Sequence, residues 1–192
     1  MPDTIRDGSG KGYLAKVNAD QQLITRATAV EQRLESAIDH NYFELTTGLI
    51  TITDAVETPM FYMKNNSATK QIVVDRIFID TWDSTDGAED GVIEYYRNPT
   101  VVGGTATVPA CTDFGSTDVA DGTFLVSPTS LTGTEWAKLY LPEQYGLVIE
   151  EGRFTLPQGS TFGMSIVPPT GNTSMKININ CAFFYINVEL IT

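Results

Sequence analysis

The feature that most constrains this chain is the series of short β-branched and aromatic segments that begins after Asn41. Glycine, proline, asparagine and aspartate separate these segments, which is typical of strands joined by turns. In residues 72–80 and 175–181 every second side chain is apolar over part of the run. Because successive side chains of a strand point to opposite faces, this alternation predicts strands with one buried face.

The predicted strands cover most of the chain after residue 41 and leave scarcely any room for helix. They span residues 42–46, 49–53, 60–64, 71–82, 92–97, 123–126, 136–141, 153–156, 161–167 and 174–189. Many short strands with Gly-rich or Pro-Pro corners predict two packed antiparallel sheets. We therefore expect an all-β body over residues 41–192, an antiparallel β-sandwich of jelly-roll type.

Residues 1–40 differ in composition and are predicted to form an N-terminal arm. The first twenty are small and polar around a Gly-Ser-Gly-Lys-Gly stretch, so they cannot bury much area. Within residues 27–39, Val30, Leu34 and Ile38 recur every four residues, which is the spacing of one helical face. The Thr-rich approach and the lack of a clear cap permit an extended conformation as well, so the arm is expected to be extended or partly helical.

Charge and hydropathy narrow the range of partners. The chain has 24 acidic and 12 basic residues, a formal net charge of -12 and a pI of about 4.3. Such a surface repels nucleic acids and anionic membranes. The start has no apolar stretch of signal-peptide length, and no later stretch approaches a membrane span. We therefore expect a protein made in the cytoplasm, with no nucleic acid and no membrane as a partner.

Catalytic and cofactor chemistry has little support in the available side chains. Cys111 and Cys181 are seventy positions apart, which fits neither a metal knuckle nor a disulfide framework, so both are expected to stay reduced. Any Ser-His-Asp or Cys-His unit would need His40, the only histidine, and no serine lies in a Gly-x-Ser-x-Gly elbow. We expect the chain not to be an enzyme and to hold no cofactor.

The acidic and aromatic side chains suggest three further kinds of site. Acidic residues between Asp80 and Asp90 could gather oxygen ligands for calcium, but their spacing favours a solvated hairpin tip, so no metal is expected. A pair of carboxylates for glycoside cleavage could come from different strands, but nothing singles out a pair. Aromatic side chains could form a sugar platform, although strand aromatics more often belong to the core. These aromatics are Trp82, Tyr95, Tyr96, Trp136, Tyr140 and Tyr145.

Several short phrases of the sequence resemble virion proteins of tailed bacteriophages. Residues 7–20, followed by 21–23, are similar to an opening that a group of these proteins shares. Further similar phrases lie at residues 47–53, 63–66, 156–160 and 168–174, whereas residues 83–141 carry no such resemblance. The resemblance implies a structural protein of the particle. It implies a capsid decoration (cement) protein, expected to be a homotrimer on the outer surface of the head.

A docking mechanism combines this resemblance with the polar arm. Isolated apolar residues of the arm would bind the major capsid protein and neighbouring copies of the chain, because a segment ordered by its partner can wrap a large surface. These predicted anchors are Ile5, Tyr13, Leu14, Val17 and Leu23. The alternative is a head-fibre, neck or tail-fibre component whose β-sandwich binds a receptor or a carbohydrate. A cell-envelope hydrolase is a third reading, which the single histidine disfavours.

Overall fold

The structure is a computed structural model. It describes residues 5–6, 14–15, 39–52, 56–82, 91–141, 147–168 and 175–187. The segment expected to be helical, 27–39, lies outside the described residues except for Asp39, which forms a turn with His40. The choice between an extended and a helical arm therefore stays a prediction.

The chain divides into two compact units, Met1–Glu31 and Gln32–Thr192. In the first unit, β1 (Ile5–Arg6) pairs antiparallel with β2 (Leu14–Ala15). This pairing brings together two short segments of the predicted arm. The second unit contains all the other described strands.

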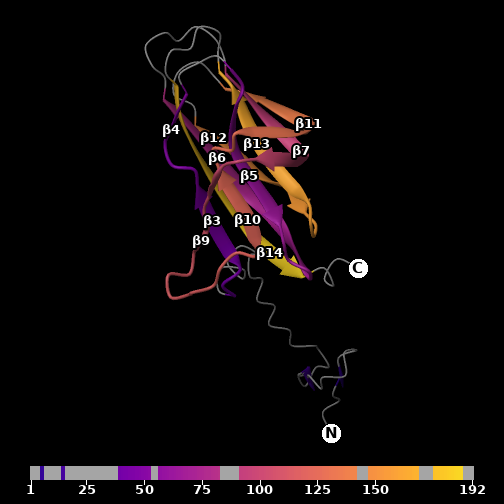
Figure 1. Ribbon diagram of the computed structural model, residues 1–192. Helices are drawn as coiled ribbons and strands as arrows, with labels where there is room; N and C mark the ends of the chain where they lie inside the picture. The colour runs from indigo at the N-terminus through magenta and orange to yellow at the C-terminus, as the bar shows by residue number, and fades with distance from the viewer. Residues whose placement is uncertain are drawn as a thin grey trace. The chain divides into compact units, whose positions relative to one another are not determined.

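The second unit consists of two six-stranded antiparallel sheets (Figure 1). One, here called the β7 sheet, has the order β11 (Ser130–Tyr140), β7 (Val92–Val102), β13 (Thr161–Val167), β5 (Thr58–Asn65), β10 (Gly122–Val126), β8 (Thr105–Ala106). The other, the β14 sheet, has the order β12 (Leu147–Leu156), β6 (Lys70–Trp82), β14 (Met175–Asn187), β3 (Tyr42–Thr46), β9 (Ala110–Cys111), and β4 (Ile50–Ile52) also pairs with β14.

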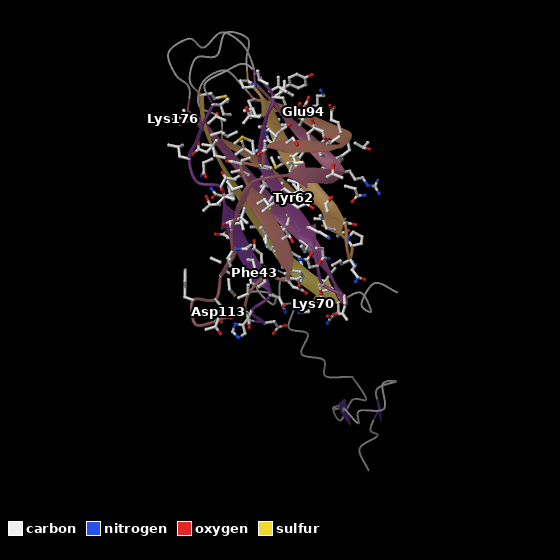
Figure 2. All side chains as sticks on the ribbon, viewed as in Figure 1. Phe43, Tyr62, Lys70, Glu94, Asp113 and Lys176 are labelled. Carbon is white, nitrogen blue, oxygen red and sulfur yellow. The ribbon has the colours of Figure 1, made fainter. Side chains whose placement is uncertain are left out.

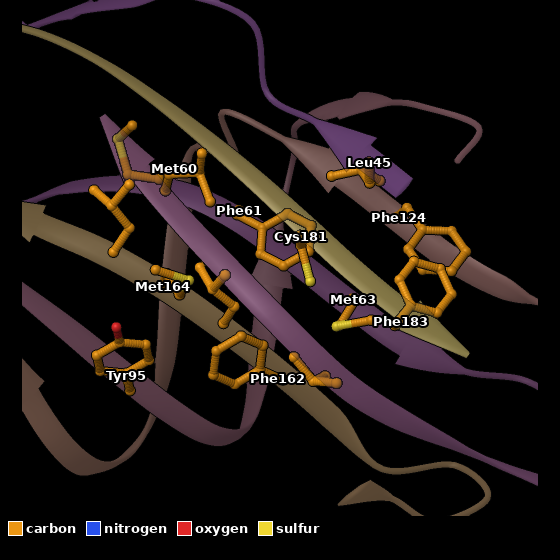
Figure 3. Close-up of a cluster of buried hydrophobic side chains, with 14 of the residues drawn as sticks. Leu45, Met60, Phe61, Met63, Tyr95, Phe124, Phe162, Met164, Cys181 and Phe183 are labelled. Atoms are coloured by element: carbon orange, nitrogen blue, oxygen red, sulfur yellow. The ribbon is translucent and has the colours of Figure 1, made fainter. Parts of the chain in front are cut away.

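One apolar core lies between the two sheets and makes the unit a β-sandwich. Phe61 and Met63 of β5 share a buried cluster with Cys181 and Phe183 of β14 (Figure 3). Phe124 of the β7 sheet stacks on Phe183 with ring centroids 5.3 Å apart. The predicted two-layer antiparallel body is therefore confirmed. Both cysteines are free thiols.

The alternation predicted in residues 72–80 holds, with one change of phase. Ile72 and Val74 point into the core, and so do Ile77 and Ile79. The change occurs because β6 has one extra residue, Asp75, where its register with β14 shifts. Such a bulge turns the next side chains to the other face.

Four neighbouring strands of each sheet, here called the eight principal strands, alternate between the sheets along the chain. β5, β7, β11 and β13 belong to the β7 sheet, and β3, β6, β12 and β14 belong to the β14 sheet. The chain therefore changes sheet at every step from one principal strand to the next, except from β7 to β11. The first and last of these strands, β3 and β14, are neighbours in the β14 sheet.

The β7–β11 ribbon bends over the outer face of its own sheet. The bend lies at Asn98 and Pro99, where Asn98 has a positive φ of 49°. Gly133 faces this point on β11, and a Cβ there would lie 2.8 Å from the Pro99 Cα. Beyond the bend, Leu131 and Pro99 lie over Gly163 of β13. The bend therefore needs a residue without a side chain at position 133.

The sequence analysis did not predict three parts of the described body. These are the distal half of the β7–β11 ribbon, the first part of β12, and the short strands β8 and β9. β8 and β9 lie in the segment between β7 and β11, at an edge of the β7 sheet and of the β14 sheet respectively. Within the described parts of the chain, no helix is long and apolar enough to span a membrane.

Candidate binding site

A pocket of about 440 Å³ opens between the sheets where β11 and β12 form their edges. It is lined by Arg97, Asn98, Trp136, Phe154, Thr155, Leu156, Pro157, Ser160, Thr161 and Phe162. Apolar rings and polar groups therefore share one concave surface. Among these lining residues, Arg97 carries the only charge.

Trp136 reaches the pocket because β11 is bulged at this point. Glu135 pairs with Tyr96 and Ala137 with Tyr95, so Trp136 is an extra residue in the ladder. Regular alternation would place Trp136 on the face opposite Ala137. The bulge instead lets the Trp136 ring contact Tyr95, a core residue, although Ala137 also packs against the core.

The facing wall is built in the same way. β12 shifts its register against β6 between Glu151 and Phe154. The Phe154 ring meets Trp136 edge to face, with centroids 5.7 Å apart, and lies 4.7 Å from the Phe162 ring. Neighbouring rings therefore hold Trp136 in place, yet 48% of its surface remains exposed.

The polar part of the pocket comes from the start of β13 and the bend in β7. The Thr161 amide donates to Asn98 Oδ1 at 3.2 Å, and the Thr161 hydroxyl donates to the Pro99 carbonyl at 3.0 Å. Arg97 is exposed and lies opposite Phe162 in the β7–β13 ladder. In the described residues no carboxylate forms an ion pair with Arg97. Within the described part of the chain, no carboxylate therefore competes with a ligand for its guanidinium.

A second pocket, of about 480 Å³, contains the histidine considered for catalysis. Its wall includes Lys70 and Phe43, which lie with Asp113 near one end of the sandwich, whereas Glu94 lies near the other end (Figure 2). Its described lining contains three aspartates, one histidine and one lysine, together with amide and hydroxyl side chains. The lining residues are Asp39, His40, Asn41, Phe43, Ser67, Thr69, Lys70, Asp118, Val119, Asp121 and Tyr185.

The contacts of His40 are those of a charge pair. Its Nδ1 lies 2.6 Å from Asp113 Oδ2, in a poorly aligned geometry that pairs charges when the ring is protonated. The Cys111 thiol points to the backbone carbonyl of His40, at 3.8 Å, and not to the ring. No serine or cysteine of the described chain hydrogen-bonds to this imidazole. The described contacts therefore assemble no nucleophile and base around His40.

A carboxylate network lies on the outer face of the β7 sheet. The Tyr96 hydroxyl lies 2.8 Å from both Glu57 Oε1 and Glu94 Oε2, and the Ser165 hydroxyl donates to Glu57 Oε1 at 2.7 Å. Lys138 Nζ donates to Glu94 Oε1 at 2.7 Å. The Tyr96 hydroxyl has one proton, so it can donate to only one of the two carboxylates at a time. The positive charge of Lys138 is therefore needed to balance the charge of Glu94. The sequence did not single out this pair of carboxylates.

The network perturbs the ionisation of its members. Burial alone would raise the pKa of Glu94, but hydrogen bonds from Lys138 and Tyr96 outweigh it and the pKa is lowered. Burial, reinforced by the carboxylates of Glu57 and Glu94, raises the pKa of Tyr96. Hydrogen bonds to Glu94 and Glu135 raise the pKa of Lys138. The shifts of Glu94 and Lys138 favour an ionised Glu94 beside a protonated Lys138, which is the behaviour of a structural ion pair.

The structure describes some of the residues predicted to form sites and not others. Of the arm residues, Ile5 lies in β1 and Leu14 in β2, while Tyr13, Val17 and Leu23 are outside the described residues. Of the residues in the predicted acidic loop, Asp80 lies in β6, and residues 83–90 are outside the described residues. Searching the described residues alone, no group of three or more His, Cys, Asp or Glu side chains could hold a metal ion.

The candidate aromatic platform separates into different environments. Tyr95 belongs to the core, and Tyr96 is buried in the carboxylate network. Trp136 is half-exposed in the pocket, and Tyr140 is 66% exposed further along β11. The side chains of Trp82 and Tyr145 are outside the described set. Sequence reasoning missed Arg97 and the phenylalanines of the pocket, since only long-range pairing brings them to Trp136.

No protein-family model matches the chain, and no curated protein matches it significantly in sequence. What the phage-like phrases imply therefore enters below as a proposal.

Proposed function

We propose that this chain is a structural protein of a tailed-phage particle, which decorates the outer surface of the head. The observation that carries the proposal is that two phage-like phrases, at 63–66 and 156–160, meet in space. They are ninety residues apart in the chain. Residues 63–65 end β5 in the β7 sheet, and residues 156–160 lead from the end of β12, in the β14 sheet, to the start of β13. If the two phrases reflect a fold that this chain shares with the phage proteins, they are expected to lie together in one structural unit.

Asn65 is the centre of this unit. Its side chain is fully buried and its Nδ2 donates to the carbonyls of Leu156 and Lys70, each at 2.9 Å. Its Oδ1 accepts from the Ser67 amide at 3.0 Å. Its backbone amide donates to the Ser160 carbonyl at 3.1 Å. Asn65 thus ties β5, in one sheet, to β6 and β12, in the other.

The order of the principal strands supports the more specific fold, a jelly roll. A jelly roll has eight strands in two antiparallel sheets that form Greek keys. When the principal strands are numbered 1 to 8 in chain order, their order across the β14 sheet is 6-3-8-1 and their order across the β7 sheet is 5-4-7-2. The remaining short strands are additions at the edges of this pattern.

In the proposed mechanism the arm binds the shell and the sandwich stands above it. An acidic body suits an exterior position because it does not contact packaged DNA. Many symmetric copies would add their weak contacts into stable attachment. The partners are the major capsid protein and neighbouring copies, in an expected homotrimer, with the predicted anchors Ile5, Tyr13, Leu14, Val17 and Leu23.

Binding to undecorated phage shells tests this proposal. We expect full-length protein to co-sediment with shells, and a variant lacking residues 1–24 to lose that binding. Serine at the five anchor positions in the full-length chain should reproduce the loss. Replacing Phe114, which is fully exposed on the sandwich, with serine is the matched control and should leave binding unchanged. Undiminished binding of the truncated protein would remove the arm from the mechanism, and no binding by the intact protein would refute decoration.

One observation favours the alternative of a head-fibre, neck or tail-fibre component. A half-exposed tryptophan in a pocket of mixed polarity is a feature that a receptor- or carbohydrate-binding sandwich would use. Electron cryomicroscopy of particles that contain the tagged chain distinguishes the two. Decoration requires density over the shell, whereas density at the neck or the fibre supports the alternative.

A further inference from the structure

We propose that the pocket between β11 and β12 binds a saccharide that carries a carboxylate, with the sugar ring against Trp136 and the acid group at Arg97. The inference does not rest on the virion assignment. It rests on the shape, the lining and the charge of the described pocket.

The aromatic wall selects a ligand with one apolar and one polar side. Trp136 exposes 48% of its surface although neighbouring rings fix its position. Large rings that stay exposed and ordered are typical of recognition surfaces, since they offer contact area at low entropic cost. A pyranose has a face of C–H groups that can cover such a ring, while its hydroxyl groups point sideways.

The rim provides partners for those hydroxyl groups. Asn98, Thr155, Ser160 and Thr161 supply amide and hydroxyl groups around the aromatic wall. A volume of about 440 Å³ falls within the roughly 300–1,000 Å³ of small-molecule sites. Asn98 Oδ1 and the Thr161 hydroxyl already have partners in the protein. A purely apolar ligand would still cover the Asn98 amide group and the Thr155 and Ser160 hydroxyls without hydrogen-bonding them, and is therefore disfavoured.

The charge distribution favours an acidic sugar over a neutral one. The chain has a net charge of -12, yet the described lining residues of this pocket include one arginine and no acidic side chain. A guanidinium can bind a carboxylate through two parallel hydrogen bonds, which gives both affinity and orientation. Arg97 forms no ion pair within the described residues, so no side chain there needs to be displaced.

The bulges make the site preformed. Register shifts in β11 and β12 bring Trp136 and Phe154 into contact from opposite sheets. Bulges that re-aim side chains are common beside binding sites, and a rigid site loses less entropy on binding. We therefore expect binding without a change of the backbone.

Saturation-transfer NMR with the full-length protein tests the inference, after a glycan array that contains uronate, sialate and neutral saccharides. Trigalacturonate and its methyl ester form a matched pair, because esterification removes the charge and keeps the ring. We expect saturation transfer to trigalacturonate at millimolar concentration, and at least about tenfold weaker binding of the ester, since each tenfold step corresponds to about 1.4 kcal/mol.

Variants locate the binding. Trp136→Ala should weaken trigalacturonate binding at least about tenfold, a change of about 1.4 kcal/mol. Tyr140→Ala, which removes another exposed aromatic ring of the same strand, is the control and should bind normally. Arg97→Gln should make the affinities for the acid and the ester equal. Trp136→Phe keeps an aromatic ring in the pocket and should retain binding. Its binding would show that the loss in Trp136→Ala comes from the missing ring and not from a folding defect.

Two results would overturn the inference. One is the absence of binding to every acidic glycan of the array, and the other is normal binding by both Trp136→Ala and Arg97→Gln. A protein that binds shells but no acidic glycan would contradict the pocket and leave decoration intact. A protein that binds acidic glycans but no shells would contradict decoration and leave the pocket inference intact.

Discussion

At the scale of single residues, Asn65 carries an unusual share of the structure. Asparagine is poorly suited to strands, and a buried amide is costly unless it is hydrogen-bonded. Here the side chain satisfies two carbonyls and one amide of the backbone, in β6, β12 and the following turn. Its removal would leave those buried groups without partners.

We predict that Asn65→Ala lowers the free energy of unfolding by about 2–4 kcal/mol, because three hydrogen bonds are lost and their partners stay buried. Urea denaturation measures this change. Asn66→Ala is the control, because Asn66 is exposed and its side chain bonds only to Thr123 among the contacts described, at 3.1 Å. Equal losses in the two variants would contradict the role of Asn65.

The Glu94–Lys138 pair gives the protein a pH-dependent contribution to stability. The pKa of Glu94 lies below its ordinary value of 4.5, so its contribution is present above about pH 4.5 and is lost as the pH falls through the lowered value. The pKa of Lys138 is raised above 10.5, so its contribution is present below pH 10.5 and lost at higher pH. The pair therefore stabilises the fold between these limits.

We predict that Lys138→Met lowers the melting temperature at pH 7 and that the deficit shrinks as the pH falls below 4.5. The reason is that Glu94 becomes protonated there and no longer needs its partner. Thermal unfolding followed by circular dichroism at several pH values checks this. Glu135→Gln removes the more exposed partner of Lys138 and should have little effect at any pH. A deficit that is independent of pH would show that packing, and not charge, is responsible.

At the scale of elements, the bend of the β7–β11 ribbon depends on a close approach of two backbones. A side chain at position 133 would meet the backbone of Pro99, which cannot move aside as a flexible side chain could. The bend in turn holds Asn98 and Arg97 at the pocket.

We predict that Gly133→Ala destabilises the protein by about 1–3 kcal/mol, because the added methyl group overpacks the bend. Gly115→Ala is the control, since a Cβ there would meet only the Asp113 side chain, at an ordinary contact distance of 3.4 Å. Chemical denaturation of both variants measures the difference. A Gly133→Ala variant as stable as the unmodified protein would show that the ribbon can open without cost.

The sequence predicts the regular elements better than the bent ones. Apolar alternation identified β6 and β14 because each has a buried face against the core. It did not identify the ribbon beyond the bend, because Pro99 and Gly133 are residues that normally argue against strand. The environment of Trp136 was equally hidden, since a bulge depends on a partner strand forty residues away.

At the scale of the whole molecule, the chain divides into two units of very different size. All the described core residues lie in the second unit, Gln32–Thr192. The β1–β2 pair belongs to the first unit.

We predict that a chain that starts at Gln32 folds with an unchanged melting temperature and an unchanged β-rich circular dichroism spectrum. The physical reason is that its apolar core and both six-stranded sheets are complete without the first unit. Loss of cooperative unfolding in this shortened chain would mean that the first unit takes part in the fold. Shell binding by the same chain should be lost if the arm is the docking element.

The central position of β14 fixes the order in which the molecule can be completed during synthesis. A ribosome releases β3 and β6 well before β14, the strand that must fit between them. Until then both strands present open hydrogen-bonding edges and uncovered apolar faces, which are templates for aggregation. The two halves of the β14 sheet therefore cannot join until β14 emerges, and closure of this sheet is a late step in the synthesis of the sandwich.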